Sequence, residues 1–424
     1  MARFSDLPEE ILVEIWSWLP PESLVQFKCV KKSWYPLITA LIKNPAFVAK
    51  HLCNSKFMTP SLIYNCGNSE FISSSLLYKY NDESNYRVGH AGFLTICNNG
   101  GNGEYLSCGI EDFKAQLVKH IENFCFVGSS CNGVVCLVDY SQGNILLCNP
   151  AIREFKILPD PCLYHMKYRP LIRVGFGYDP ITNAYKVVRV FGWIDGFTAQ
   201  VYTLGNNSWR DIDYLQTKTR HQSIRRTIKA VYSKGVYYWL LRASNYEEIV
   251  HSFDMHDEKF HIIPLPDNCQ ESEFISNYNT NLTQWNESVV LFCYPKIERL
   301  ITKPIEMWVM RDSSVDRPCW TKHRSIDPLG GIHKTPIAFW KSDELLLRED
   351  KKRLVSYNLL TGKFKSIHEE DQITSFYAFP HVKSLVSVNI SETLPTQPLG
   401  SLGNCLRPPI SIQPPFFGCW KYKY

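Results

Sequence analysis

Apolar residues in the first 45 positions recur at helical spacing. Between residues 11 and 19 they fall every three or four positions, and Pro20–Pro21 ends this segment because proline clashes with a continuing helix. Two more such segments follow before Asn44–Pro45. The pattern predicts three short helices. A region of about 40 residues cannot enclose its own apolar faces, so it either packs against the rest of the chain or docks on a partner.

Residues from about 60 to 390 carry a different pattern of short, strand-sized runs that are rich in β-branched and aromatic residues, such as Val236–Leu241 and Ser288–Cys293. A unit repeats roughly every 50 residues. In each unit a strand is followed by a turn, and an aromatic residue comes directly after the turn. The closing aromatics are Phe155, Trp209, Phe260, Trp320 and Phe364. This period predicts a large all-β propeller. A pair of β-sandwiches is the alternative.

Composition narrows the class of protein. The chain has 424 residues, of which 45% are hydrophobic and 21% charged, which excludes a disordered or collagen-like protein. No apolar run reaches the length of about 18 residues that spans a bilayer. Acidic residues interrupt the first apolar stretch, so we expect no signal peptide. A net charge of +5 is small for a nucleic-acid binder. The 15 cysteines contain no Cys-x-x-Cys pair and are expected to be reduced and mostly buried.

The N-terminal segment resembles the F-box. The similarity rests on Leu7–Ile15, Leu19–Pro20, Ser23–Leu24, Phe27–Val30 and Lys32–Trp34. In that family the apolar surface docks on the Skp adaptor of a Skp–cullin–F-box ubiquitin ligase. The resemblance implies an F-box over residues 1–45. It also implies a set of adaptor-binding residues, namely Leu7, Pro8, Ile11, Leu19, Pro20, Leu24 and Phe27. The competing interpretation is an ordinary amphipathic helical hairpin.

The middle region resembles the plant F-box-associated domain, which is kelch-like in architecture. Cys148–Pro159, Gly175–Pro180 and Tyr185–Val190 carry that similarity. Further strings are similar to the S-locus F-box family: Phe260–Pro266, Glu306–Met310, Cys319–Lys322 and Phe339–Leu346. The resemblance implies a propeller-like domain over residues 46–394. The last segment, 395–424, has six prolines and no acidic residue, and it is predicted to be extended and poorly folded.

Candidate chemistry is sparse. The chain contains no nucleophile elbow, Walker A loop or His-Glu-x-x-His motif, so no catalytic residue, metal or cofactor is predicted. His251, His256 and His261 lie near Asp254 and Asp257, but their spacing does not favour convergence on one ion, and we expect solvated turn residues. A basic run stands out, with Lys218, Arg220, Arg225 and Arg226 among its members. It is interpreted as a solvated loop or, alternatively, as a target-binding loop that meets an acidic patch.

These observations and the resemblance together imply a non-enzymatic substrate-recognition subunit of a Skp–cullin–F-box ubiquitin ligase. Its expected partners are the Skp adaptor, cullin through that adaptor, and a protein target, with no nucleic acid or membrane. The S-locus similarity implies a role in pollen-side self-incompatibility, with stylar ribonucleases as targets. The expected location is the cytosol of the pollen tube, with the nucleus as a second possibility. The alternatives are an F-box receptor for a defence or developmental regulator, and a ligand- or glycan-binding propeller.

Overall fold

A computed structural model describes most of the chain before residue 390. The described ranges are 7–56, 61–66, 90–99, 103–109, 125–139, 143–159, 171–193, 196–214, 226–242, 248–269, 278–295, 303–311, 319–327, 334–349, 354–367 and 376–389. The segment 395–424, predicted to be poorly folded, lies outside them. Among the described residues, no helix is long and apolar enough to cross a membrane.

Four helices come first along the described chain: α1 (Glu9–Trp16), α2 (Pro21–Phe27), α3 (Trp34–Leu41) and α4 (Pro45–Ser55). The three predicted helices are therefore present, and α4 is additional. Asn44 caps α4, since its side-chain oxygen accepts hydrogen bonds from the backbone N–H groups of Ala46 (2.9 Å) and Phe47 (3.3 Å). The pair Asn44–Pro45 follows one helix and begins the next, whereas the sequence pattern predicted only the end of a helix there.

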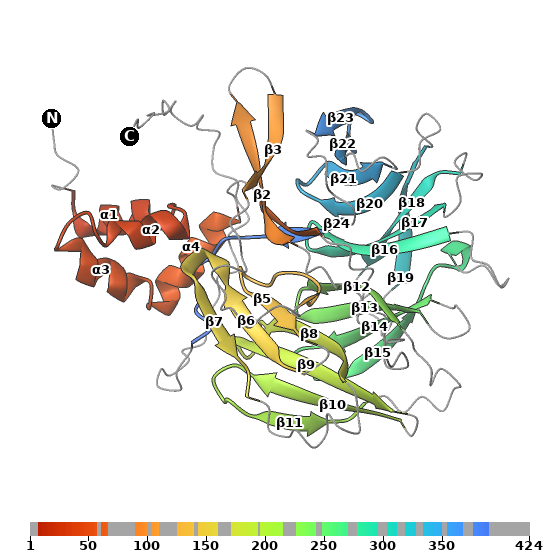
Figure 1. Ribbon diagram of the computed structural model, residues 1–424, viewed down its shortest axis with the longest axis horizontal. Helices are drawn as coiled ribbons and strands as arrows, with labels where there is room; N and C mark the ends of the chain where they lie inside the picture. The colour runs from red at the N-terminus through yellow and green to blue at the C-terminus, as the bar shows by residue number, and fades with distance from the viewer. Residues whose placement is uncertain are drawn as a thin grey trace, which may run out of the picture. The chain divides into compact units, whose positions relative to one another are not determined.

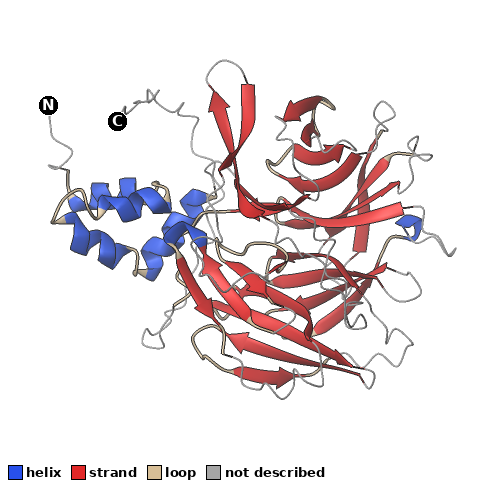
Figure 2. Cartoon of the chain, viewed as in Figure 1, coloured by secondary structure: helices blue, strands red, loops and turns tan. Residues whose placement is uncertain are grey.

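The described strands form six four-stranded antiparallel sheets (Figures 1 and 2), and two 3-10 turns, η3 (Pro150–Ile152) and η4 (Asp267–Cys269), lie between strands. Five sheets use consecutive strands: β4 (Cys125–Phe126), β5 (Val135–Val138), β6 (Ile145–Asn149) and β7 (Glu154–Ile157); β8 (Leu171–Asp179), β9 (Ala184–Trp193), β10 (Gly196–Thr203) and β11 (Trp209–Ile212); β12 (Arg226–Ser233), β13 (Val236–Arg242), β14 (Glu248–Asp254) and β15 (Phe260–Pro264); β16 (Tyr278–Trp285), β17 (Ser288–Pro295), β18 (Ile305–Arg311) and β19 (Cys319–Ile326); β20 (Lys334–Phe339), β21 (Glu344–Glu349), β22 (Leu354–Asn358) and β23 (Phe364–Ile367).

The sixth sheet joins distant parts of the sequence. It combines β24 (Phe376–His381) with β1 (Ser61–Cys66), β2 (His90–Asn99) and β3 (Gly103–Gly109), and β24 pairs antiparallel to β1 with Ser61 opposite His381. The first strands of neighbouring sheets contact one another. β8 contacts β12, β12 contacts β16, β16 contacts β20, and β20 contacts β24. Pairing between the last strand and the first closes the β-propeller, which confirms the predicted architecture.

The predicted repeat has a structural counterpart. All five closing aromatics lie on the fourth strand of a sheet: Phe155 on β7, Trp209 on β11, Phe260 on β15, Trp320 on β19 and Phe364 on β23. Two of them also connect neighbouring sheets. The indole N–H of Trp209 donates to the carbonyl of Pro159 (2.6 Å), and that of Trp320 donates to the carbonyl of Pro264 (2.9 Å). Trp209 and Trp320 therefore each lie on the last strand of one sheet and bond to the chain at the end of the last strand of the preceding sheet.

The cysteine expectation is partly wrong. Cys131 and Cys148 are buried and free, as predicted, and burial raises the pKa of each thiol to about 12. Cys269 and Cys293, however, form a disulfide across 24 residues of sequence, with Cα atoms 6.1 Å apart. Both belong to one apolar cluster between adjacent sheets. Pairing that depends on the packing of two sheets leaves no short motif in the sequence.

Candidate functional site

The helical module, residues 7–56, has a small apolar core that is not made by the helices alone. Its buried members are Leu12, Trp16, Leu24, Trp34, Ile38 and Phe47, together with Leu385 from beyond β24. The rings of Trp16 and Trp34 meet edge to face with centroids 5.4 Å apart. Ile152, between β6 and β7, packs on the same cluster. The propeller therefore completes the core of the module.

The predicted adaptor-binding residues occupy three different environments. Pro8, Ile11 and Pro20 are exposed, whereas Leu7, Leu19 and Phe27 are half-buried. Leu24 is 0% exposed and lies within the core. The side chain of Leu24 can therefore support a docking surface from below but does not form part of it in this structure.

Sequence analysis missed several exposed apolar side chains on the same module. Trp18, Val25, Val30 and Tyr35 are 45%, 36%, 65% and 59% exposed, and Ile11, which was predicted, is 46% exposed. We call these five residues the exposed apolar set. A signal was available, because positions 11 and 18 lie two helical turns apart and share one face. That face differs from the one that carries the buried Leu12 and Trp16.

A short segment after β24, residues 382–389, which we call the strap, holds the module to the propeller. Leu385 inserts into the helical core, and the ammonium of Lys383 lies 2.5 Å from the carboxylate of Glu22 in α2. The side-chain amide of Asn149 donates to the carbonyls of Ser384 (3.0 Å) and Val386 (2.8 Å). The strap is thus bonded to the propeller by its backbone and by the hydroxyls of Ser384 and Ser387. It is held to the helices by the side chains of Lys383 and Leu385.

The propeller has two ends that differ in how the strands are connected there. At one end, the turn end, short turns join the first strand of a sheet to the second and the third strand to the fourth. The helical module contacts this end, through Ile152 and through an ion pair between Lys56 and Glu287 (3.5 Å). Glu287 lies in the turn between β16 and β17. At the other end, the loop end, strands β12, β16 and β20 begin and strands β13, β17 and β21 finish. Figure 1 shows the helices on one side of the sheets.

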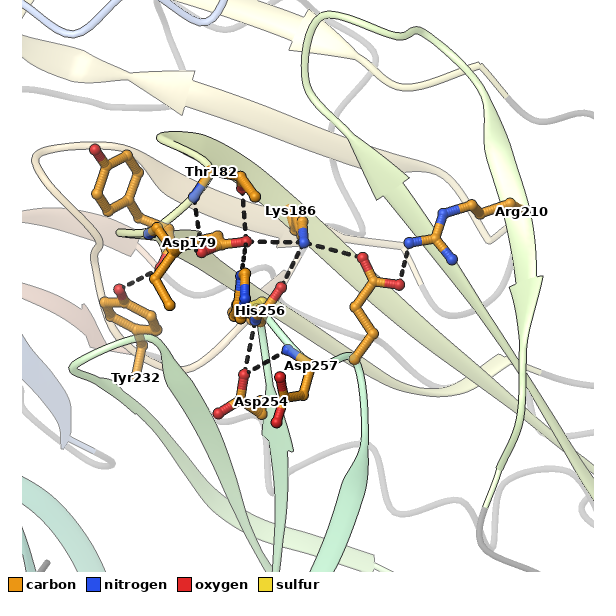
Figure 3. A network of polar contacts seen from close by, with 12 residues as sticks. Asp179, Thr182, Lys186, Arg210, Tyr232, Asp254, His256 and Asp257 are labelled. Carbon is orange, nitrogen blue, oxygen red and sulfur yellow. Dashed lines mark hydrogen bonds and ion pairs between the residues drawn. The ribbon is translucent and has the colours of Figure 1, made fainter. Parts of the chain in front are cut away.

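The densest polar network of the turn end surrounds Asp179 and Lys186 (Figure 3). The Lys186 ammonium lies 3.0 Å from the Asp179 carboxylate and 2.9 Å from that of Glu258, and it donates to the carbonyl of Met255 (2.5 Å). Burial acts to raise the pKa of Asp179, but hydrogen bonds from Thr182 and Lys186 outweigh it and hold the pKa well below its usual range. The network ties the β8–β9 turn to the β14–β15 turn, and we read it as an inter-sheet link.

The histidine cluster does not assemble into a metal site. His256 lies 3.4 Å from Asp179, whereas Asp254 caps its own turn by accepting from the backbone N–H groups of His256 and Asp257. His251 was expected to be a solvated turn residue, but it is buried on β14 and only 4% exposed, because its strand position faces the core. Within the ranges described, no group of three or more His, Cys, Asp or Glu side chains could hold a metal ion.

Of the predicted target-binding residues, only Arg226 lies within the described part of the chain, at the loop end. Lys218, Arg220 and Arg225 lie outside the described residues. Arg226 begins β12, where it pairs with Arg242 at the end of β13, and its side chain is likewise not described. The basic run therefore leads into the first strand of a sheet at the end opposite the helical module.

Comparison with protein families gives two matches. Residues 94–338 match the family of the F-box associated beta propeller domain, and residues 4–47 match the F-box-like family. The first match covers more than half of the chain, and the second covers α1 to α3 and the start of α4.

The chain is also similar to individual F-box proteins and to solved structures. The F-box/kelch-repeat protein At3g23880 of Arabidopsis thaliana is 26% identical over 370 residues, which are 85% of this chain and 89% of that protein. Another protein of Arabidopsis thaliana named as an F-box protein, At3g16210, is 26% identical over 266 residues, and the match spans 63% of this chain but only 62% of that relative. Among solved structures, a chain of a nidogen/laminin complex covers 76% of this chain at 11% identity, with 99% of its own length and a TM-score of 0.41.

Proposed function

The chain belongs to the family of proteins with an F-box-associated β-propeller domain, and we propose that it is the substrate-recognition subunit of a Skp–cullin–F-box ubiquitin ligase. In this proposal the helical module binds the Skp adaptor and the propeller binds a protein target. The chain itself carries out no bond chemistry. It acts by keeping lysines of the target close to a ubiquitin-loaded partner, since proximity alone removes much of the entropic barrier of a reaction between two molecules.

The observation that carries the proposal is the exposed apolar set on the segment that matches the F-box-like family. Large apolar side chains gathered on a small module mark an interaction surface, and aromatic residues such as Trp18 and Tyr35 are enriched at binding hot spots. The core beneath them is already filled by Leu24 and its neighbours. These exposed side chains therefore add nothing to the core and are available to an adaptor.

The position of the module supports a division of labour between the two ends of the propeller. The strap and the Lys56–Glu287 pair fix the helices at the turn end, which leaves the loop end open to a target. Loops on a rigid scaffold can vary without disturbing the core. A module that is packed against the propeller, rather than tethered by a linker, holds the target at a defined distance from the ligase.

The finer part of the proposal concerns the target. The similarity of Phe260–Pro266 and Phe339–Leu346 to S-locus F-box proteins supports a stylar ribonuclease as target, a role in pollen-side self-incompatibility, and action in the cytosol of the pollen tube. Affinity purification of the protein from pollen tubes, followed by identification of co-purifying proteins, tests this assignment. Recovery of a defence or developmental regulator in place of a ribonuclease would exclude the S-locus role and leave the ligase role intact.

Adaptor binding is tested by charge substitutions at matched isoleucines in the full chain. Ile11→Asp places a carboxylate on the exposed apolar set, and we expect co-precipitation of the Skp adaptor to weaken by roughly tenfold or more, because a hot-spot residue contributes about 2 kcal/mol or more. Ile181 is 70% exposed in a turn of the propeller, and Ile181→Asp should leave adaptor binding unchanged.

Leu24→Asp serves a different purpose, because Leu24 is buried. Placing an unpaired carboxylate in the core should unfold the helical module. We therefore expect this variant to lose adaptor binding, and we expect the backbone amides of α1 and α2 to lose their protection from hydrogen exchange. Normal adaptor binding by Ile11→Asp, or by a chain that lacks residues 1–45, contradicts the proposed function.

A further inference from the structure

The disulfide between Cys269 and Cys293 joins two neighbouring sheets near the loop end. Cys269 is the last residue of η4, the turn that follows β15, and Cys293 lies on β17, two residues before that strand finishes. Their Cα atoms are 6.1 Å apart, although the chain between them includes the whole of β16. The bond therefore attaches the chain that leaves one sheet to the second strand of the next sheet.

Residues 264–269, which we call the crossing segment, are held at three points. The carbonyl of Pro264 accepts a hydrogen bond from the indole N–H of Trp320 in the second sheet (2.9 Å). Leu265 is 3% exposed within the apolar cluster between the two sheets. Cys269, at the other end of the segment, is bonded to Cys293. Of these three attachments, only the disulfide depends on the oxidation state of the surroundings.

The two sheets have further contacts that do not involve sulfur. The hydroxyl of Thr280 on β16 donates to the carboxylate of Glu248 on β14. Leu240 on β13 and Leu291 on β17 are both 0% exposed in the cluster that the sheets share. Breaking the disulfide should therefore free the end of the crossing segment while the propeller stays closed.

The two sulfur-bearing residues differ in how far a small molecule can approach them. Cys269 is 8% exposed and Cys293 is 1% exposed, so Cys269 is the more accessible side of the bond. A small thiol such as glutathione attacks the sulfur of Cys269 and forms a mixed disulfide, and the sulfur of Cys293 leaves and takes up a proton. A second small thiol attacks the sulfur of the first, which releases the Cys269 thiol and a small disulfide. One protein disulfide is thus reduced while two small thiols are oxidised, and the reverse sequence restores the bond.

We propose that Cys269 and Cys293 form a redox switch, in which the oxidised pair holds the crossing segment on β17 and the reduced pair releases its end. The inference rests on the proposed function in one respect, because that function places the protein in the cytosol. Protein disulfides there are usually transient or redox-sensing, since thiol pools keep cysteines reduced. Cys131, Cys136 and Cys148 are also buried, yet they are not bonded to another cysteine, so burial alone does not produce the pair.

The first experiment equilibrates the purified full chain in glutathione buffers that run from strongly reducing to strongly oxidising, and then blocks free thiols for mass spectrometry. We expect Cys269 and Cys293 to pass together from blocked thiols to a linked pair within this range. A bond that persists in the most reducing buffer, or that does not re-form in the most oxidising one, overturns the switch, because the pair is then fixed in one state.

Hydrogen exchange in the two extreme buffers measures the change in conformation. In the oxidised chain the backbone N–H of Cys269 donates to the carbonyl of Pro266 (2.8 Å). Reduction should speed the exchange of the crossing segment by roughly tenfold or more, because it removes a covalent constraint on this end of the segment. The amides of β13 should not change. Equal exchange of the crossing segment in both buffers overturns the inference.

Cys269→Ser separates loss of the pair from other effects of reduction, since its crossing segment should exchange fast in every buffer. Cys53→Ser is the matched control, because Cys53 is an exposed free cysteine on α4, and this variant should respond as the wild type does. Exchange in Cys269→Ser that still depends on the buffer overturns the inference. Thermal unfolding shows whether each variant is folded, and the wild-type titration decides the outcome without any variant.

Adaptor co-precipitation from the same buffers keeps the switch and the proposed function apart. The adaptor binds the helical module in that proposal, and the switch lies at the opposite end of the propeller. A chain that switches but binds no adaptor contradicts only the ligase role. A chain that binds the adaptor but keeps one redox state in every buffer contradicts only the switch.

Discussion

The helical module and the propeller are stabilised in different ways. Adjacent propeller sheets pack through apolar faces, as in the cluster between the β12–β15 and β16–β19 sheets, where Leu240, Val250, Leu282 and Leu291 are all 0% exposed. The module has six buried apolar residues of its own and takes Leu385 from the other end of the chain. A repeated architecture builds its core from its neighbours, whereas a module of about 50 residues needs an added support. The strap supplies this support.

The strongest test of this difference removes the support without touching a helix. Leu385→Ala should lower the free energy of unfolding of the helical module by about 2–4 kcal/mol, the usual cost of truncating a buried leucine. Because the substitution lies more than 300 positions from α1 to α4, its effect can reach them only through packing. Native-state hydrogen exchange measures it as faster exchange of the helical amides, while amides of β13 and β17 should stay protected.

Leu360→Ala is the control for this experiment, since Leu360 is 79% exposed in a turn and its truncation should change the free energy of unfolding by less than about 0.5 kcal/mol. Unchanged exchange of the α1–α4 amides in Leu385→Ala would show that the helices fold without the propeller.

The sequence predicted repeated structure better than it predicted contacts between distant segments. Five closing aromatics at a period near 50 residues were enough to predict a propeller, although not its number of sheets, because each of the five sheets that carry them is local in sequence. The sixth sheet depends on β24 pairing with β1, the disulfide on Cys293 reaching Cys269, and the module core on Leu385. These contacts join segments without a shared pattern. The disulfide requires two adjacent sheets to pack, and the pairing of β24 with β1 requires the propeller to close.

The same limit applies to the candidate sites. Helical periodicity located the module and its exposed Ile11, but it could not separate the buried Leu24 from the surface, because both fit an apolar stripe. The basic run was visible in the sequence, but Lys218, Arg220 and Arg225 lie outside the described residues, so its role as a target-binding loop stays a prediction.

A second test uses acid to separate the two regions, through the buried His381 at the end of β24. Burial lowers the pKa of this imidazole to about 3 from 6.5, so the unfolded chain binds more protons than the folded one between these values, and stability falls as the pH falls below 6.5. One pKa unit corresponds to about 1.4 kcal/mol, so the loss between pH 6.5 and 5 should be about 2 kcal/mol. Denaturant unfolding of the propeller across this range measures it.

His381→Gln should flatten part of this acid dependence, although it also removes the contact between Nδ1 and the Ser130 hydroxyl (2.9 Å). Burial likewise lowers the pKa of His51 in α4, so the helical module retains an acid dependence of its own in this variant. An identical pH slope in wild type and His381→Gln for the propeller transition would contradict the assignment.

The smallest expected effect concerns the ion pair between the two regions. Lys56 and Glu287 are 50% and 65% exposed in their side chains, with the charged atoms 3.5 Å apart, and exposed pairs of this kind contribute about 0–1 kcal/mol. Lys56→Ala should therefore change the exchange of the helical amides far less than Leu385→Ala does, and the change should disappear in high salt, because salt screens exposed charges. Hydrogen exchange of both variants at low and high salt makes the comparison. A larger effect for Lys56→Ala than for Leu385→Ala would mean that charge, and not the buried leucine of the strap, holds the module to the propeller.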